Sequence, residues 1–289
     1  MSHVSACGRL WGGVLVAIAA CSPPDAEPLA DSPAVTSAAV LTPVPVSSTW
    51  SRELGRFLVL PVEGESLAVV LFPESDTTSP LGDTRITLLN AAGDTASVTT
   101  RLDTLQCTDA PLVRLSGTIL PGWWVGLQDP TAEIIRMDSV ESLPRVDSAR
   151  ITTALARLAS RLAARGKPDF KGLPFVVARA RRFMIDGREV VVAHLVRRVP
   201  QEAAPLEEHT FLIIERPPTR GAPFEIAYSQ QSDGTEENAE YFETLAAARG
   251  TDGILLLLAR DRMLQSTYQI ISRSRAGSWT LRWSRDFRC

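Results

Sequence analysis

The chain has 289 residues, of which 45% are hydrophobic and 22% are charged, and its mean hydropathy is +0.04. This composition is typical of a globular protein and excludes a wholly disordered chain. The formal net charge of −3 at pH 7 argues against nucleic acid as a partner of the whole chain, because nucleic-acid-binding domains are usually basic.

The N-terminal segment has the pattern of a signal peptide. Residues 1–9 contain one arginine and no acidic residue, and the apolar run 10–20 follows them. A run of this length is too short to cross a bilayer, which takes ~20 apolar residues, but it matches the apolar core of a secretory signal. We therefore expect an exported protein from which residues 1–20 are removed.

The run ends at Ile18-Ala19-Ala20-Cys21, which resembles the lipobox of bacterial lipoproteins. In that family an aliphatic residue and two small residues precede the cysteine that receives the lipid. The resemblance covers residues 1–21 only, and it departs from the usual pattern in having Ile18 at the first position. It implies that Cys21 is lipidated and anchors the protein to the membrane of the cell envelope. Ser22 resembles the signal for sorting to the outer membrane, facing the periplasm. The alternative is an ordinary secretory signal that leaves the cysteine unmodified.

Residues 21–49 are predicted to be a linker rich in Pro, Ala and Ser. Pro-rich linkers are extended and semi-rigid, at ~3 Å per residue. We expect this segment to hold the folded part, residues 50–289, away from the membrane.

Two cysteines remain after export and lipidation. Cys7 would leave with the signal peptide and Cys21 would carry the lipid, which leaves Cys107 and Cys289. Cysteines in an oxidising compartment most often pair, so we expect a disulfide between these two. The alternative is two unpaired, buried thiols.

Residues 50–146 are predicted to form a β-rich N-terminal half. Short segments rich in β-branched residues alternate with turn signals that contain Gly, Pro, Asp and Ser. The predicted strands cover residues 57–62, 66–72, 84–90, 95–102, 112–120 and 123–127.

One amphipathic helix is predicted over residues 147–166. Asp147 or Ser148 is the expected N-cap, and Gly166 is placed to end the helix. The apolar residues that recur at helical spacing are Ile151, Leu155, Leu158 and Leu162.

Residues 167–289 are predicted to form a β-rich C-terminal half. Asp186-Gly187 between two apolar runs indicates a two-residue hairpin, and the Ala-rich segment 238–248 favours a short helix. The predicted strands cover residues 175–185, 188–199, 209–217, 224–230, 253–261, 267–274 and 278–287. The predicted fold is therefore α+β, mostly antiparallel β in two halves joined by one amphipathic helix.

His194 and His209 lie on consecutive predicted strands, and antiparallel pairing would bring them close together. Two histidines can start a metal site, but no third ligand stands at a recognised spacing. The acidic run 232–240 lacks the spacing of a calcium loop, and its acids are expected to favour the start of the following helix. The sequence predicts no metal and no cofactor.

No motif for nucleophilic catalysis is present in the sequence. There is no G-x-S-x-G elbow, no S-x-x-K box and no H-E-x-x-H helix. A hydrolase would have to combine one of the two histidines with an ordinary serine. The candidate serines are Ser229, Ser232 and Ser266.

Charge is unevenly distributed along the chain. Residues 157–198 contain eleven basic residues and three acidic ones, a net charge of +8, whereas residues 51–145 contain seven basic and thirteen acidic ones, a net charge of −6. Such asymmetry favours an anionic partner, either an anionic envelope polymer or an acidic protein face. The alternative is that the two segments pair within the fold. The candidate carriers of a basic face are Arg157, Arg161, Arg179, Arg181, Arg182, Arg197 and Arg198.

Taken together, these features predict a membrane-anchored lipoprotein that serves as a non-enzymatic binding or accessory module of the cell envelope. The alternative is an extracytoplasmic hydrolase with an unrecognised site.

Overall fold

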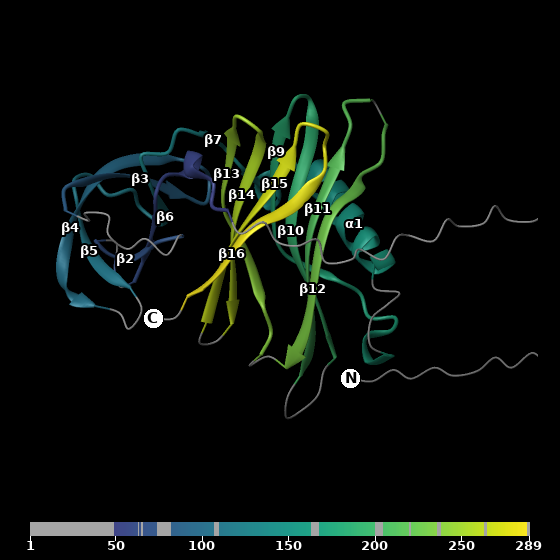
Figure 1. Cartoon of the computed structure of the whole chain (residues 1–289). Helices are drawn as coiled ribbons and strands as arrows, with labels where there is room; N and C mark the ends of the chain where they lie inside the picture. Colours follow the sequence, from purple (N-terminus) through teal and green to yellow (C-terminus); the bar gives the residue numbers. More distant parts are fainter. Residues whose placement is uncertain are drawn as a thin grey trace, which may run out of the picture. The chain divides into compact units, whose positions relative to one another are not determined.

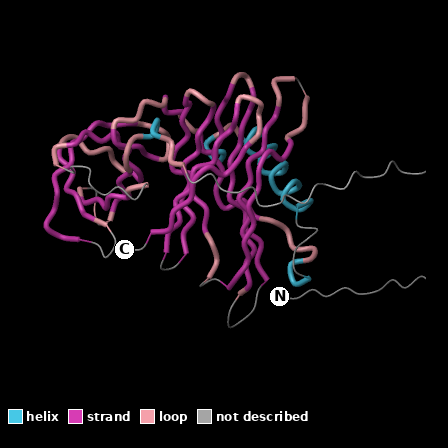
Figure 2. Tube along the Cα trace, in the orientation of Figure 1, coloured by secondary structure: helices cyan, strands magenta, loops and turns pink. Residues whose placement is uncertain are grey.

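Antiparallel strands dominate the computed structural model, and one long helix accompanies them in the described residues (Figures 1 and 2). The α+β prediction is confirmed. The structure describes residues 49–62, 64, 66–73, 82–106, 110–162, 168–199, 205–219, 221–235, 238–262 and 265–287. The expectations for the signal peptide, the linker, Cys21, Cys107 and Cys289 lie outside these residues.

The first six strands form a closed barrel with the order β1-β2-β5-β4-β3-β6. Their alternating apolar residues fill the barrel on one side and face a neighbouring sheet on the other. Trp123 is buried inside the barrel, whereas the Trp124 indole points outward and donates a 2.8 Å hydrogen bond to the Leu245 carbonyl. The strands are β1 (Leu58–Pro61), β2 (Leu67–Leu71), β3 (Thr84–Asn90), β4 (Thr95–Gln106), β5 (Pro111–Ser116) and β6 (Trp123–Gln128).

Two five-stranded antiparallel sheets follow, which we call sheet B (β16-β15-β14-β13-β7) and sheet C (β12-β11-β10-β9-β8). The short strands β7 (Glu133–Ile135) and β8 (Asp138–Ser139) come from the predicted N-terminal half but complete the sheets of the C-terminal half. The other strands are β9 (Val176–Ile185), β10 (Arg188–Val199), β11 (Leu206–Arg216), β12 (Glu225–Thr235), β13 (Tyr241–Gly250), β14 (Gly253–Arg262), β15 (Gln265–Ser274) and β16 (Trp279–Phe287).

Both sheets are covered on both faces. One core packs sheet B against sheet C and includes Phe211, Ile254 and Leu256. The other face of sheet B packs on the outside of the barrel, and the other face of sheet C packs on the helix α1 (Arg145–Leu162). Because neither sheet has a solvent face along its middle strands, β10 and β14 contain continuous apolar runs instead of alternating ones.

The Asp186-Gly187 hairpin is confirmed. The two residues have φ values of 48° and 78°, which is the left-handed pair that a two-residue type I′ turn requires. The remaining described helices are single 3-10 turns, namely η1 (Arg52–Leu54), η2 (Val140–Ser142) and η4 (Pro168–Phe170). No helix among the described residues is long and apolar enough to cross a membrane.

The helix predicted over residues 238–248 is wrong, because most of that segment is strand β13. Ala247 belongs to the core between the two sheets, whereas Ala246 and Ala248 face the barrel. Burial on both faces between β14 and β7 outweighs the helix propensity of alanine. The acids of 232–240 therefore do not begin a helix: Ser232–Thr235 ends β12, and Glu240 pairs with arginines of β14.

The long helix begins two residues earlier than predicted. The backbone N–H of Ser148 donates a 3.0 Å hydrogen bond to the Pro144 carbonyl, so the first turn starts before Asp147. The helix is described as far as Leu162. The predicted stop at Gly166 lies outside the described residues.

Candidate ligand-binding site

An open groove runs along one face of α1. Residues 146, 149, 150, 153 and 157 recur every three or four positions and so share this face, while Ile151, Leu155 and Leu158 of the opposite face are buried against the sheet. The segment 221–224 between β11 and β12 forms the second wall. The cavity has a volume of about 590 Å³ and is lined by Val146, Ala149, Arg150, Thr153, Ala154, Arg157, Arg216, Gly221, Ala222, Pro223 and Phe224.

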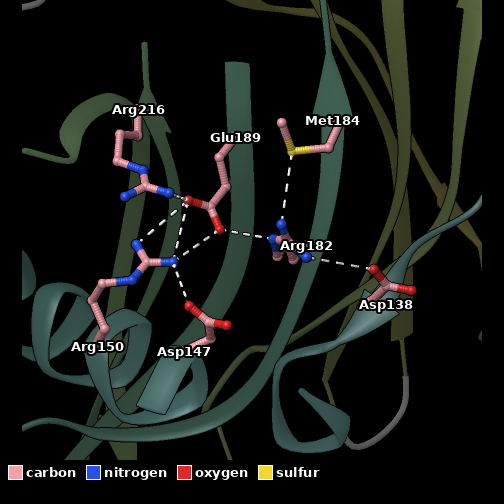
Figure 3. Close-up of polar contacts among 7 residues, drawn as sticks. All are labelled: Asp138, Asp147, Arg150, Arg182, Met184, Glu189 and Arg216. Atoms are coloured by element: carbon pink, nitrogen blue, oxygen red, sulfur yellow. Dashed lines mark hydrogen bonds and ion pairs between the residues drawn. The ribbon is translucent and has the colours of Figure 1, made fainter. Parts of the chain in front are cut away.

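Glu189 anchors the arginines at one side of this groove (Figure 3). Its carboxylate is buried, with only 3% of the residue exposed. It accepts hydrogen bonds from Arg150 and Arg182 and forms an ion pair with Arg216. The Arg182 Nε lies 2.7 Å from Oε1, the Arg216 Nη2 lies 2.6 Å from Oε2, and Arg150 reaches both oxygens at 3.3–3.4 Å. A buried carboxylate with these partners fixes the arginines in place, since charge-assisted hydrogen bonds are strong and directional.

An aromatic ring holds two of the same arginines. The guanidinium groups of Arg150 and Arg216 lie 5.4 and 5.3 Å from the ring centre of Phe224, within the range of a cation–π interaction. Phe224 itself packs into the core under α1. The wall of the groove therefore combines positive charge with apolar surface.

Among the described residues, three arginines and no carboxylate line the groove. Arg150 and Arg216 share the charge of Glu189, and Arg150 also pairs with Asp147 at 3.3 Å. Arg157 is exposed and has no ion pair within the described part of the chain. At the groove's end, 80% of Val146 is exposed, so apolar and cationic groups both face the solvent there.

The seven arginines predicted as a basic face do not lie on one surface. Arg157 and Arg161 are exposed on α1. The other five contact their own chain: Arg179 pairs with Glu243, Arg181 lies over the Trp124 ring, Arg182 pairs with Glu189 and Asp138, Arg197 pairs with Glu208, and Arg198 pairs with Glu207. Of these carboxylate partners, only Asp138 belongs to the acidic segment 51–145. Most of the internal pairing occurs within the C-terminal half.

His194 and His209 meet as the pairing of β10 and β11 predicts. The Nε2 atom of His194 lies 2.8 Å from Nδ1 of His209, and Nε2 of His209 lies 2.8 Å from a carboxylate oxygen of Glu207. Arg198 pairs with the same carboxylate. The rings are buried between the sheets beside Tyr241 and Phe242.

Burial controls the protonation of this chain of groups. Loss of solvation, together with the nearby His209 and Arg179, lowers the pKa of His194 to about 3. Burial also lowers the pKa of His209, although its hydrogen bond to Glu207 opposes that effect. Burial opposes ionisation of Glu207, but hydrogen bonds from His209 and Arg198 outweigh it and lower the pKa of that carboxyl. Both histidines are therefore neutral at pH 7, and Glu207 is ionised.

The hydrogen bonds leave His209 without a free ring nitrogen. Ser232 lies opposite His209 in the ladder, and its hydroxyl is buried without a hydrogen-bond partner. A serine nucleophile needs a histidine nitrogen to accept its proton, and both nitrogens of His209 are already used. Ser229 and Ser266 lie on β12 and β15, and within the described residues neither serine is hydrogen-bonded to a histidine. Among described residues, no three His, Cys, Asp or Glu side chains are placed to hold a metal ion.

Sequence reasoning missed Arg150, Arg216, Glu189 and Phe224 as parts of one site. Arg150 and Arg157 are seven residues apart on the predicted helix, which was a signal that they share a face. Nothing in the sequence connects them to Phe224, because the contact depends on how α1 packs on sheet C. Searches of protein-family models, of curated proteins and of solved structures find no match for this chain.

Proposed function

We propose that the protein is an exported, lipid-anchored binding module of the cell envelope, and that the groove along α1 binds an anionic amphiphile. By this we mean a molecule that carries a phosphate or carboxylate beside an apolar portion. The observation that carries the proposal is a groove whose described lining contains three arginines and no acidic residue.

The lining suits both parts of such a ligand. Arg157 has a charge that no described carboxylate balances, and Arg150 and Arg216 are held in fixed positions by Glu189. Arginines fixed in this way need less ordering when they bind an anion. Val146 and Pro223 are exposed and offer apolar surface to the apolar part of the ligand. Pockets of ~300–1,000 Å³ are typical for small ligands, and this groove falls in that range.

The anchor rests on the sequence. The resemblance of Ile18-Ala19-Ala20-Cys21 to a lipobox supports attachment through Cys21. Fractionation of cells that express the wild type or Cys21→Ala tests it. We expect the wild type in the membrane fraction and the variant in the soluble periplasmic fraction. Equal membrane association of both would contradict the anchor.

Ligand binding is tested with octyl phosphate as the probe, by isothermal titration calorimetry on the purified protein. Octyl glucoside, which lacks the charge, and inorganic phosphate, which lacks the apolar chain, are expected to bind more weakly. Arg157→Gln should weaken octyl phosphate binding about ten-fold, as expected for the loss of one charge-assisted hydrogen bond.

Arg161→Gln is the matched control for that variant. Arg161 is exposed on the same helix, one turn further on, but does not line the groove. We expect its affinity to equal that of the wild type. If both variants bind alike, or if octyl glucoside binds as tightly as octyl phosphate, the groove is not a site for anionic amphiphiles.

One observation favours the second candidate, an extracytoplasmic hydrolase. Glu207, His209 and His194 form a hydrogen-bonded chain of the kind that can orient a general base. If Glu207 accepts a hydrogen bond from Nε2–H of His209, and Nδ1 of His209 accepts one from Nε2–H of His194, the remaining base is Nδ1 of His194. Hydrolysis of p-nitrophenyl esters that is lost in His194→Gln would support this candidate against the binding module.

A further inference from the structure

A second cavity lies where three hairpin loops of sheets B and C meet. It has a volume of about 390 Å³, and it is separate in its lining from the groove on α1. Its walls come from the β9–β10 turn, the β13–β14 turn and the end of β15. The lining residues are Ile185, Asp186, Arg249, Gly250, Thr251, Gly253, Ile254, Arg273, Ser274 and Arg275.

The charges of this lining do not balance, since the residues that the structure describes there include three arginines and one carboxylate. The Arg275 guanidinium donates a 2.6 Å hydrogen bond to the carbonyl oxygen of Thr251, which is a neutral partner. Arg275 has no ion pair with any residue that the structure describes. Its positive charge is therefore available to an anion in the cavity.

The other two arginines differ in how firmly they are held. Arg273 makes two hydrogen bonds to Glu215, at 2.5 and 3.0 Å, and so keeps a fixed position in the wall. Arg249 reaches Asp186 at 3.2 Å and Glu133 at 4.0 Å, and the carboxylates of both are more than 70% exposed. Exposed pairs of this kind contribute only ~0–1 kcal/mol, so an anion can replace Asp186 as the partner of Arg249.

We propose that this cavity binds a phosphate group carried by a small polar molecule such as a sugar phosphate. Arginine is well suited to phosphate because its planar group can donate two parallel hydrogen bonds. Of the described lining residues, only Ile185 and Ile254 have large apolar side chains, in contrast to the groove with its exposed valine and its phenylalanine. The cavity therefore selects a polar phosphate ester, and this inference does not depend on the groove.

The test is calorimetric titration of the purified protein with glucose 1-phosphate, with glucose and with matched concentrations of potassium chloride. We expect saturable binding of glucose 1-phosphate and none of glucose. Arg275→Gln should weaken the affinity about ten-fold, because one charge-assisted hydrogen bond is lost. Asp186→Asn should strengthen the affinity, because it removes the single carboxylate of the lining.

Arg161→Gln serves as the matched control, since it removes an exposed arginine that lines neither this cavity nor the groove. Arg157→Gln, which alters the groove, is measured beside it. The proposal is overturned if the wild type shows no saturable binding of glucose 1-phosphate up to about 10 mM. A Kd above that concentration corresponds to a binding free energy of less than ~3 kcal/mol. It is also overturned if Arg275→Gln binds like the wild type, if Asp186→Asn binds more weakly, or if only Arg157→Gln loses binding. The last result would place the phosphate in the groove.

Discussion

The Nε2 atom of His194 lies 2.8 Å from Nδ1 of His209, and this hydrogen bond joins two strands through the buried space between the sheets. One ring must donate and the other must accept, so the pair cannot carry a proton on both of these nitrogens. The contact is therefore compatible with two neutral rings and not with two charged ones.

Acidification should destabilise the protein through this pair. The pKa of His194 is about 3 in the folded state and about 6.5 in an unfolded chain. Between these values the unfolded state binds more protons, so the stabilisation is complete above the unfolded pKa and is lost as the pH falls towards the folded pKa. We expect the free energy of unfolding in urea to fall between pH 7 and pH 5, by at most ~1.4 kcal/mol per pH unit for each histidine.

A window above pH 5 separates this effect from that of the carboxyls of Glu207 and Glu215. The lowered pKa values of Glu207 and Glu215 affect stability only below their ordinary range. His194→Gln should reduce the slope between pH 7 and pH 5, whatever it does to the absolute stability. A wild-type stability that is constant over this window would contradict the prediction.

Glu189→Gln should destabilise the fold, because it leaves Arg150, Arg182 and Arg216 without their shared carboxylate. Removing one member of a buried ion pair costs about 3–5 kcal/mol, and we expect about 2–3 kcal/mol here because the arginines are roughly one-third exposed. Urea unfolding measures the change. Glu225→Gln, at an exposed position of β12, is the control and should alter stability by less than ~0.5 kcal/mol. Equal effects of the two variants would mean that Glu189 does not organise the cluster.

Gly126→Ala should destabilise the barrel by overpacking it. A Cβ atom at Gly126 would lie 2.6 Å from methyl groups of Ile86 and Val59, and both belong to the barrel core. Overpacking of this kind costs about 1–3 kcal/mol. Gly82→Ala meets no atom within 4 Å and should leave the melting temperature unchanged or slightly raised. A neutral Gly126→Ala would show that β3 and β6 can move apart.

Arg197→Lys should be more harmful than Arg198→Lys, although both exchange one cation for another. Arg197 is buried, hydrogen-bonded to Glu208 and to the Phe170 carbonyl at 2.7 and 2.8 Å, and lies over the Phe170 and Phe175 rings. Lysine lacks the planar group that makes these contacts together. We expect a loss of about 2 kcal/mol for Arg197→Lys and a smaller one for Arg198→Lys, measured by urea unfolding. Similar losses would contradict a special role of the guanidinium.

Local patterns predicted most strands but failed at β13. Asp186-Gly187 specifies its own turn, because both residues adopt positive φ easily. The segment 238–248 has the alanines of a helix, and only its position between β14 and β7 makes it a strand. The pairing of β10 and β11 was enough to predict that His194 and His209 meet. The pairing could not predict that both ring nitrogens of His209 are hydrogen-bonded. The second bond goes to Glu207 on the same strand, and it depends on the directions of the two side chains.

The sequence by itself determined the α+β class, the amphipathic helix and the uneven charge, because these follow from periodicity and composition over neighbouring residues. The tertiary structure decided what the charges do. It paired Arg182, Arg197 and Arg198 with buried carboxylates, and it left Arg157 and Arg275 without an ion pair among the described residues. The physical reason is that an ion pair depends on a distance of a few ångströms in space, and such distances between segments far apart in the chain arise only when the sheets and the helix pack together.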